Sequence, residues 1–391
     1  MKVTGVRTRL YEFKAGRALG DVNLPTGSDR ANGLAVFLDT DAGVTGVTTG
    51  SPGARAAIHG LAESCLVGQD PRGVRGLWKR MVDAVFKGGN RGAVTGAISA
   101  LDIALWDLKA KIAGEPLWRT LGASVPRVKA YASGIDLNLT DEQIGTFYGG
   151  LAAQGVHAGK LKVGIDEEAD ERRLDIMRAA LATSGKRPIL TIDSNEYWSP
   201  KQAIRRISQL EERFDLFWVE EPARRWDYRG LRQVSRAVRA AVATGENLHE
   251  IGDFMALIAN EAVDIVQVGS GTSGITGALQ VADMAYGFEL PVAVMNCPGN
   301  FMAHLAAALP NHSMMEVVQA GREVCFTVDT RIEDGYIVLG ETPGLGMVFD
   351  EEKLAKLEVA ALTPGVSLGS WGRRRGAGLF VVPPDEIDDL H

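Results

Sequence analysis

The chain reads ILTIDSN at 189–195, DLFWVEEP at 215–222 and AVATGEN at 241–247, three apolar runs that each lead into a carboxylate. The carboxylates are Asp193, Glu220 and Glu246, separated by 27 (220 − 193) and 26 (246 − 220) positions. That spacing is typical of one strand-and-helix unit, and side chains at the carboxyl ends of neighbouring barrel strands converge. Oxygen ligands of this kind suit a divalent cation such as Mg²⁺. The stretches predict an α/β barrel with a metal site at one end.

Each acid taken alone also has a purely structural explanation. An aspartate after a strand often caps the following helix, and Glu-Glu-Pro can be a solvated loop. Three acids in register are harder to explain in this way, because carboxylates held together without a cation repel one another. We therefore favour the metal site and a metal-dependent enzyme.

The alternation of apolar runs with helical segments extends on both sides of these stretches. Eight strand candidates, enough to close a barrel, lie at 128–134, 160–164, 189–195, 215–222, 241–247, 264–270, 291–296 and 313–318. Between them we expect Asp141 to cap one helix and Ser199-Pro200 to open another. The predicted barrel covers residues 126–325.

The flanking segments read differently. Residues 1–50 alternate strand-like runs with turns, which predicts an antiparallel meander, and a helical pattern follows and ends before Gly114. Residues 15–32 are rich in Gly, Asp, Pro and Asn, and we expect a lid-like loop there. Residues 326–391 are expected to pack back onto the amino-terminal domain, with the basic Arg373–Arg375 run in solvent or at a subunit contact.

Composition narrows the class of protein. The chain has 391 residues, of which 46% are hydrophobic, and a net charge of −7, so we expect a large core and no nucleic-acid partner. Cys65, Cys297 and Cys325 are too few and too scattered for a disulfide framework. The amino-terminal stretch lacks a long apolar run, so neither a signal peptide nor a membrane span is expected. We expect a cytoplasmic protein.

Lys160 and Lys162 lie two positions apart on the second predicted barrel strand, so their side chains point to the same side. Two lysines on a strand are more often found at an exposed edge, but a closed parallel barrel has no edge. If that side is the barrel interior, both ammonium groups face the metal site. Neighbouring positive charge lowers the pKa of a lysine, which suits a general base near neutral pH.

These residues together resemble the mandelate racemase/muconate lactonizing enzyme group of the enolase superfamily, over nearly the whole chain. The resemblance is carried by SALDIALWDLKAKIAGEPLWRTLG (99–122), the Lys-x-Lys of GKLKVG, the Asp-x-Asn of DSNEYW, VEEP, GEN and SGITG (273–277). It implies a modified TIM barrel, (β/α)7β, with an α+β capping domain over residues 1–125. It also implies that Asp193, Glu220 and Glu246 hold Mg²⁺.

The resemblance further implies how the chemistry is divided. Lys162 would remove the proton α to a carboxylate, while Lys160 would depress the pKa of Lys162 and contact that carboxylate. Glu316 in MMEV would hydrogen-bond the substrate carboxylate, and Asn195 would stand beside the metal ligands. Because the ionised product carries two negative charges, a divalent cation must supply most of its stabilisation. A Lys or His base working with Mg²⁺ is the device of this superfamily.

The sequence departs from the racemases of this group, which carry a second base on the opposite face. The corresponding positions hold Val268 or Gly269 on strand six, and Met295 or Asn296 on strand seven, none of which titrates. With one base, β-elimination of water fits best, because Lys162 could take the α-proton and then protonate the departing hydroxyl. We therefore favour an acid-sugar or related hydroxy-acid dehydratase, a hydro-lyase of carbohydrate acid catabolism.

Two alternatives remain open: a racemase, epimerase or cycloisomerase, of which a cycloisomerase can work with one base, and an inactive homologue that binds metal or ligand. We expect the loop at 15–32 and the GSPGAR segment near residue 50 to shape a site for a small-molecule carboxylate. The candidate polar contacts are Asp21, Asn23, Arg30, Arg55, Asn195 and Asn296. The resemblance also suggests a homo-oligomer.

Overall fold

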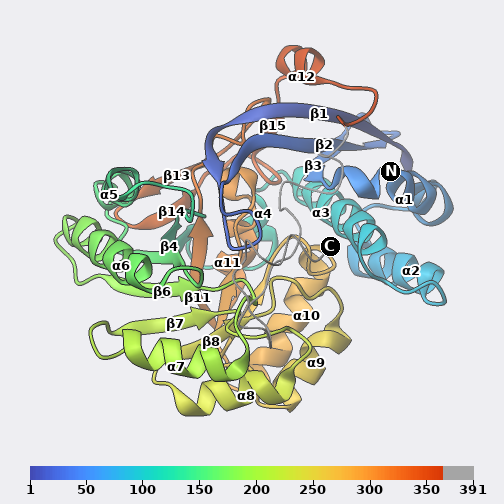
Figure 1. Cartoon of the computed structure of the whole chain (residues 1–391). Helices are drawn as coiled ribbons and strands as arrows, with labels where there is room; N and C mark the ends of the chain where they lie inside the picture. Colours follow the sequence, from blue (N-terminus) through green and yellow to red (C-terminus); the bar gives the residue numbers. More distant parts are fainter. Residues whose placement is uncertain (364–391) are drawn as a thin grey trace.

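Eight parallel strands form a closed barrel in the computed structural model, which describes residues 1–363 (Figure 1). The strands are β4 (Arg127–Ser133), β5 (Ala158–Lys162), β6 (Ile189–Asp193), β7 (Leu216–Glu220), β8 (Ala241–Thr244), β9 (Ile265–Val268), β10 (Val292–Val294) and β11 (His312–Val317). Each strand pairs with the next along the chain, and β11 pairs with β4 to close the ring. All eight predicted strands are confirmed. Each strand ends one to three residues earlier than predicted.

Helices return the chain on the outside of the barrel, giving the predicted (β/α)7β order. They are α5 (Asp141–Ala152), α6 (Glu167–Ala182), α7 (Pro200–Leu210), α8 (Tyr228–Ala237), α9 (Ile251–Ala259), α10 (Gly274–Gly287) and α11 (Ala303–Ala308). Ser199 caps α7 and Pro200 opens it, as predicted. The prediction for α5 is wrong by one residue. Thr140 is the cap, because its side chain accepts from the amide of Gln143, and Asp141 is the first helical residue.

The lower half of the barrel interior is filled by side chains, and this filling decides where a site can form. Its members are Tyr131, Ala158, Trp218, Ala243, Ile265, Ala293 and Met314. The rings of Tyr131 and Trp218 meet edge to face, with centroids 5.0 Å apart. This layer fills the interior below the carboxyl ends of the strands, so a site can form at those ends.

A separate antiparallel sheet lies across the barrel mouth (Figure 1), built from β1 (Val3–Leu19), β2 (Ser28–Thr40) and β3 (Thr45–Gly50). The short elements η1 (Pro52–Ala54) and η2 (Ala62–Leu66) flank α1 (Arg55–Leu61), and α2 (Val74–Val85), α3 (Ala93–Ala113) and α4 (Leu117–Thr120) follow. Helix α3 is buried on nearly every side and contacts both β3 and α10. It ends at Gly114, whose φ of +72° is the left-handed stop predicted from the sequence.

The predicted lid-like loop at 15–32 is largely strand, which corrects the sequence analysis. Strand β1 runs to Leu19 and β2 begins at Ser28, since backbone pairing between them continues past a register shift to the Leu19–Ser28 pair. Only residues 20–27 form the connecting turn. This turn is docked on the barrel, because Gly20 donates to Ile135 O (2.9 Å) and accepts from Leu137 N (3.0 Å).

The segment after the barrel contacts both the barrel and the amino-terminal domain. Strand β14 (Tyr336–Leu339) pairs with the start of β4 and carries β13 (Thr330–Glu333) on its outer edge, so these strands extend the barrel sheet. The prediction that the whole segment packs on the amino-terminal domain is therefore wrong for this hairpin. Strands β12 (Phe326–Val328) and β15 (Met347–Phe349) pair with each other, and α12 (Glu351–Leu357) lies against β1 (Figure 1).

The boundaries 1–125, 126–325 and 326–391 stay predictions, and Arg373–Arg375 lie outside the described residues. Within residues 1–363, no helix is both long and apolar enough to cross a membrane.

Candidate active site

The carboxyl ends of β5, β6 and β7 bring lysines and carboxylates into contact. Strand register places Lys162 beside Asp193, and Asp193 beside Glu220. Lys162 Nζ lies 2.5 Å from Asp193 Oδ2, and Lys160 Nζ lies 2.5 Å from Glu220 Oε1. Both lysine side chains therefore point to the same side, as the strand period predicts, and that side is the barrel interior.

Lys160 lies at the buried bottom of this cluster, with only 1% of its surface exposed. Its ammonium also contacts Glu316 Oε1 at 3.0 Å and Asp193 Oδ2 at 3.3 Å. Burial lowers the pKa of Lys160, but the facing Glu220 and Glu316 carboxylates outweigh that effect and hold the pKa well above its usual range. Lys160 is thus a fixed positive charge in this arrangement.

Lys162 also has a raised pKa in this structure. Burial is the largest single effect and lowers the pKa of its ammonium, but Asp193, Glu246 and Glu220 together raise the pKa by more, so the net shift is upward. This is opposite to the predicted direction. The predicted decrease rested on neighbouring positive charge, whereas the geometry puts a carboxylate in direct contact with the ammonium.

Negative charge exceeds positive charge at this end of the barrel. The acids are Asp193, Glu220, Glu221, Glu246 and Glu316, and the facing cations are Lys160 and Lys162. Burial, together with the neighbouring carboxylates, raises the pKa of Glu220 and Glu246. Glu220 Oε2 is buried with no hydrogen-bond partner among the described residues. The cluster is therefore short of positive charge.

This donor set fits a divalent cation, since hard carboxylate oxygens, a surplus of negative charge and an unused buried oxygen occur together. In the present arrangement no three acid, histidine or cysteine groups among residues 1–363 are placed to hold a metal by themselves. The ammonium of Lys160 stands between Asp193 and Glu220. A cation on these carboxylates would require the lysines to give up contacts that they make here.

Glu316, on the last barrel strand, is held ionised. Burial raises its pKa, but Lys160 and Lys162 outweigh burial and lower the pKa to about 2. The backbone amide and side-chain amide of Asn296 donate to Glu316 Oε2 at 3.1 and 2.6 Å. Arg322 in turn donates to Asn296 Oδ1 at 2.7 Å, which fixes the orientation of the amide.

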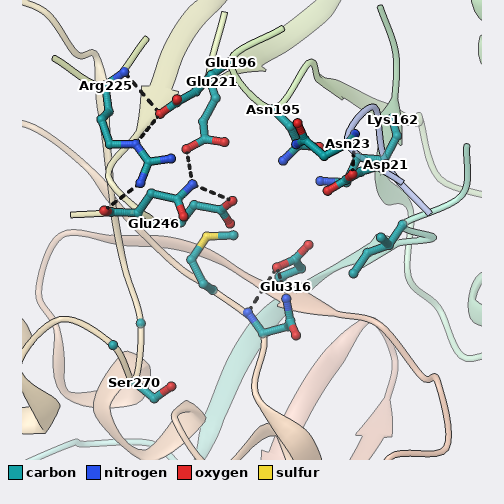
Figure 2. Close-up of a pocket in the computed structure, with 16 residues that line it drawn as sticks. Asp21, Asn23, Lys162, Asn195, Glu196, Glu221, Arg225, Glu246, Ser270 and Glu316 are labelled. Atoms are coloured by element: carbon teal, nitrogen blue, oxygen red, sulfur yellow. Dashed lines mark hydrogen bonds and ion pairs between the residues drawn. The ribbon is translucent and has the colours of Figure 1, made fainter. Parts of the chain in front are cut away.

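A cavity of about 450 Å³ opens above the cluster (Figure 2). Predicted site residues that line it are Asp21, Asn23, Lys162, Asn195, Glu246, Asn296 and Glu316. Lys160, Asp193 and Glu220 are almost completely buried and are not part of the lining. The cavity thus meets the cluster through Lys162, Glu221, Glu246 and Glu316.

Two predicted contacts lie elsewhere. Arg30 lines a neighbouring cavity rather than this one. Arg55 lines neither cavity, which corrects the sequence prediction: it lies on the exposed side of helix α1, and its Nε donates to Thr8 Oγ1 at 3.2 Å. The GSPGAR segment was expected to reach the site, but only its first residues approach the mouth.

The residues of the wall that faces Lys162 across the cavity were not among the predicted site residues (Figure 2). Arg225 Nε donates to Glu196 Oε1 at 2.6 Å, and Arg225 Nη1 donates to Asn247 O at 3.1 Å. Asn247 donates to Glu221 Oε1 at 2.7 Å. Glu196, Glu221 and Asn247 follow predicted site residues directly and could have been included on that ground. Arg225 carried no signal in the sequence.

Backbone strain marks the same wall. Asn195, Glu196 and Glu221 have φ values of +44°, +60° and +46°, a region that side chains other than glycine rarely adopt. Such strain is found preferentially at functional sites, where the surrounding structure enforces it. Here Glu196 N donates to Glu221 O, which ties the two strained turns together.

The positions expected for a second base carry groups that do not titrate. Gly269 and Met295 line the cavity, while Val268 is buried in the barrel wall. Asn296 is engaged with Glu316. Lys162 is therefore the titratable nitrogen that reaches the cavity from β5, with no histidine or lysine at the ends of β9 and β10.

Comparisons with known proteins agree with this geometry. Residues 24–122 match the mandelate racemase/muconate lactonizing enzyme N-terminal domain, and residues 148–353 match the enolase C-terminal domain-like family. The 3,6-anhydro-alpha-L-galactonate cycloisomerase of Streptomyces coelicolor is 32% identical over 90% of this chain and 96% of that protein. The L-talarate/galactarate dehydratase of Salmonella typhimurium is 33% identical over 78% of this chain and 75% of that protein.

Solved structures of the same family superpose on this chain. A racemase from Streptomyces coelicolor with bound magnesium superposes with a TM-score of 0.82 and 30% identity, covering 91% of this chain and all (100%) of that one. The Salmonella typhimurium dehydratase, liganded with Mg and L-lyxarohydroxamate, superposes with a TM-score of 0.82 and 27% identity, over 92% of this chain and 93% of that one. These relatives are divided between lyases and isomerases.

Proposed function

Because the chain belongs to the mandelate racemase/muconate lactonizing enzyme family of the enolase superfamily, we propose that it removes the α-proton of a hydroxylated carboxylate and eliminates water. The substrate class is an acid sugar or a related hydroxy acid. The observation that carries the proposal is the asymmetry of the cavity: Lys162 reaches it from β5, whereas Gly269 and Met295 stand at the ends of β9 and β10. One base suffices for elimination when the proton and the hydroxyl leave from the same face.

We propose that Asp193, Glu220 and Glu246 hold Mg²⁺. The unused Glu220 Oε2 and the surplus of negative charge support this ligand set. The bound ion would stabilise the negative charge that develops on the substrate carboxylate. A ligand role for Asp193 would also weaken its contact with Lys162, and this contact is the largest of the effects that raise the pKa of that ammonium.

Lys162 is the proposed base and acid. As a free amine it takes the α-proton, and as the resulting ammonium it can return a proton to a hydroxyl that departs on the same side. Lys160, buried beneath, keeps positive charge near the substrate carboxylate. Glu316 is ionised, so it can accept a hydrogen bond from a substrate hydroxyl. A hydrogen bond between Glu316 and a substrate carboxylate, which the resemblance implies, would require one of the two groups to carry a proton.

A cycloisomerase is the second candidate, because a relative with that activity is 32% identical over 90% of this chain, and intramolecular ring chemistry can also proceed with one base. A racemase or epimerase would need another proton carrier on the wall that faces Lys162.

The deciding experiment offers a library of monoacid and diacid sugars to the enzyme with Mg²⁺ in D₂O. Formation of 2-keto product is followed by semicarbazide absorbance, and α-deuteration by NMR. We expect keto product from the wild type and from the exposed-lysine control Lys201→Ala, and none from Lys162→Ala. Deuteration or ring isomerisation without keto product would move the assignment to an isomerase. Folded enzyme that neither turns over nor deuterates any acid would point to a binding protein.

Metal binding is tested without turnover. Titration of the wild type with MgCl₂ in a calorimeter should give one site, and free Mg²⁺ at 100 times its Kd should stabilise the fold by about 2.7 kcal/mol. Asp193→Asn and Glu246→Gln should lose this stabilisation, whereas Glu212→Gln on the exposed surface should keep it. Equal stabilisation of all four proteins would refute the ligand set.

A further inference from the structure

A second cavity, of about 370 Å³, lies between the amino-terminal sheet, helix α3 and the loops of the barrel mouth. Ser270 and Gly271, in the loop after β9, line this cavity and the catalytic one as well. The two cavities therefore meet at this loop. Figure 2 shows Ser270 well apart from Lys162, so the second cavity continues away from the proposed base.

The two cavities differ in charge. The catalytic cavity is lined by five acids, Asp21, Glu196, Glu221, Glu246 and Glu316, against two cations, Lys162 and Arg225. The second cavity is lined by Arg30 and Arg322, with no aspartate or glutamate among the described residues of its wall. A pocket lined by charge of one sign concentrates ligands of the opposite sign, so the second cavity favours an anion.

Buried donors in the second cavity lack partners. Ser99 projects from α3, is only 5% exposed, and its Oγ has no hydrogen-bond partner among the described residues. Arg322 uses Nη2 to hold Asn296, but its buried Nε is likewise unpaired within residues 1–363. A carboxylate or phosphate accepts several hydrogen bonds at once, and a guanidinium offers the matching fork.

Arg322 also links the two ends of the site. It donates to Asn296, and Asn296 donates to Glu316, so a chain of two hydrogen bonds runs from the second cavity to the catalytic one. An anion bound at Arg322 would therefore hold the amide that positions Glu316. Arg30, on β2, approaches the same space from the amino-terminal domain.

We propose that the second cavity receives the distal, anionic end of the substrate. The preferred substrates would then be acid sugars with a second negative group, carboxylate or phosphate, remote from the carboxylate that reacts. This inference rests on the proposed function for the identity of the reaction. The recognition of the distal anion rests on Arg30, Arg322 and Ser99.

The kinetic test uses three probes of one stereochemistry: a six-carbon aldarate, the corresponding aldonate, and that aldonate phosphorylated at its terminal carbon. The principal variant is Arg30→Gln, because Arg30 does not contact the proposed catalytic groups. We expect Arg30→Gln to raise KM for the preferred dianion about tenfold, because one charge-assisted hydrogen bond is lost. The kcat should stay within about twofold of the wild-type value. The aldonate should be unaffected. Arg55→Gln is the matched control, since Arg55 lines neither cavity.

Arg322 is tested by a conservative pair. Arg322→Gln should raise KM for the dianion and also lower kcat, because Asn296 loses its partner, while Arg322→Lys should restore part of the KM effect by keeping the charge. If Arg30→Gln and Arg322→Gln change KM equally for the aldonate and the dianions, the cavity does not recognise the distal anion.

A binding measurement separates this inference from the reaction. Calorimetry on the Lys162→Ala enzyme with Mg²⁺ compares the affinities of the three probes. The same measurements are then made on the double variant Lys162→Ala/Arg30→Gln. A dianion preference that disappears in the double variant supports the inference even if no probe is turned over. Equal affinity for aldonate and both dianions overturns it, even if elimination of water from aldonates is established. The preferred dianion identifies the group as carboxylate or phosphate.

Discussion

Among the single residues of the site, Lys160 is a buried charge in contact with several carboxylates. It is buried, yet its ammonium touches carboxylates of Asp193, Glu220 and Glu316. Removing a charge from water is costly, and close contact with opposite charges offsets that cost. The charge of Lys160 and the charges of its three partners therefore depend on one another.

Substitution of Lys160 by methionine would leave those carboxylates buried without their cation. We expect the free energy of unfolding at pH 7, without Mg²⁺, to fall by about 3–5 kcal/mol, as for other broken buried ion pairs. The loss should shrink towards pH 5, because carboxylates with raised pKa values take up protons in the folded state. Urea denaturation measures both effects, with Lys201→Met as the exposed control. A variant as stable as the wild type at pH 7 would contradict this account.

Among the elements, the end of β5 is held in place by a buried polar network. Asp136 accepts from the backbone amide of Lys162 at 3.0 Å and from Arg173 Nη2 at 2.9 Å. The hydroxyl of Tyr148, on α5, lies 2.5 Å from Asp136 Oδ2. Helices α5 and α6 thus set the position of the strand that carries Lys162.

Tyr148→Phe removes the hydroxyl without changing the ring. Asp136 Oδ2 would lose its donor in a dry environment, and an unsatisfied buried acceptor costs about 1–3 kcal/mol. We expect that decrease in the urea unfolding free energy. Tyr286→Phe, at an exposed tyrosine, should be neutral. If both substitutions have the same effect, the network does not support β5.

The hairpin turn between β1 and β2 is the second element that meets the site, through Asp21 and Asn23. A Cβ on Gly20 would lie 2.7 Å from Asn138 Oδ1 and 3.0 Å from Leu24 O, so we expect Gly20→Ala to displace the Asn138 side chain and shift the turn where it meets the barrel loop. We expect KM to rise while the unfolding free energy changes little, because only the end of the hairpin moves.

The control for Gly20→Ala is Gly5→Ala on the same strand, where an added Cβ meets nothing within 4 Å. Steady-state kinetics on the substrate found by the library experiment would measure the effect. An unchanged KM in Gly20→Ala would show that the docked turn does not shape the substrate site.

In the molecule as a whole, His304 joins three separate parts of the chain. It lies on α11 of the barrel, its Nδ1 accepts from the amide of Trp118 on α4 (3.0 Å), and its Nε2 lies 3.2 Å from Leu345 O. Accepting at Nδ1 places the proton on Nε2, which then donates to Leu345. Burial lowers the pKa of His304 to about 4, so the imidazole is neutral in the folded protein.

This lowered pKa makes stability depend on pH. Between about pH 6.5 and pH 4 the unfolded chain binds a proton at His304 that the folded chain does not, so stability falls as the pH is lowered through that range. A difference of about 2.5 pKa units corresponds to about 3 kcal/mol. His304→Gln should be less sensitive than the wild type in urea denaturations from pH 7.5 to 4.5. The exposed control His59→Gln should keep the wild-type slope.

Much of the fold was predictable because its signals are local. Strand runs, the glycine stop after α3 and the proline start of α7 depend on residues within a few positions of one another. The prediction failed where a distant partner decided the outcome. Residues 15–19 and 28–32 look like loop by composition, but they belong to strands β1 and β2: residues 30–32 pair with residues 12–14, and Leu19 pairs with Ser28. Arg55 looks like a site residue by position, but its helix turns it to the surface.

The sequence by itself determined the alternation of strands and helices and the identity of the acids and lysines at the strand ends, because side-chain period and turn chemistry are properties of neighbouring residues. Only the tertiary structure decided which charges touch. Lys162 meets Asp193, Arg225 meets Glu196, and Arg322 reaches Glu316 through Asn296. Electrostatic energy depends on the distance between charges and on their burial, and both arise only when the barrel closes and the second domain covers its mouth.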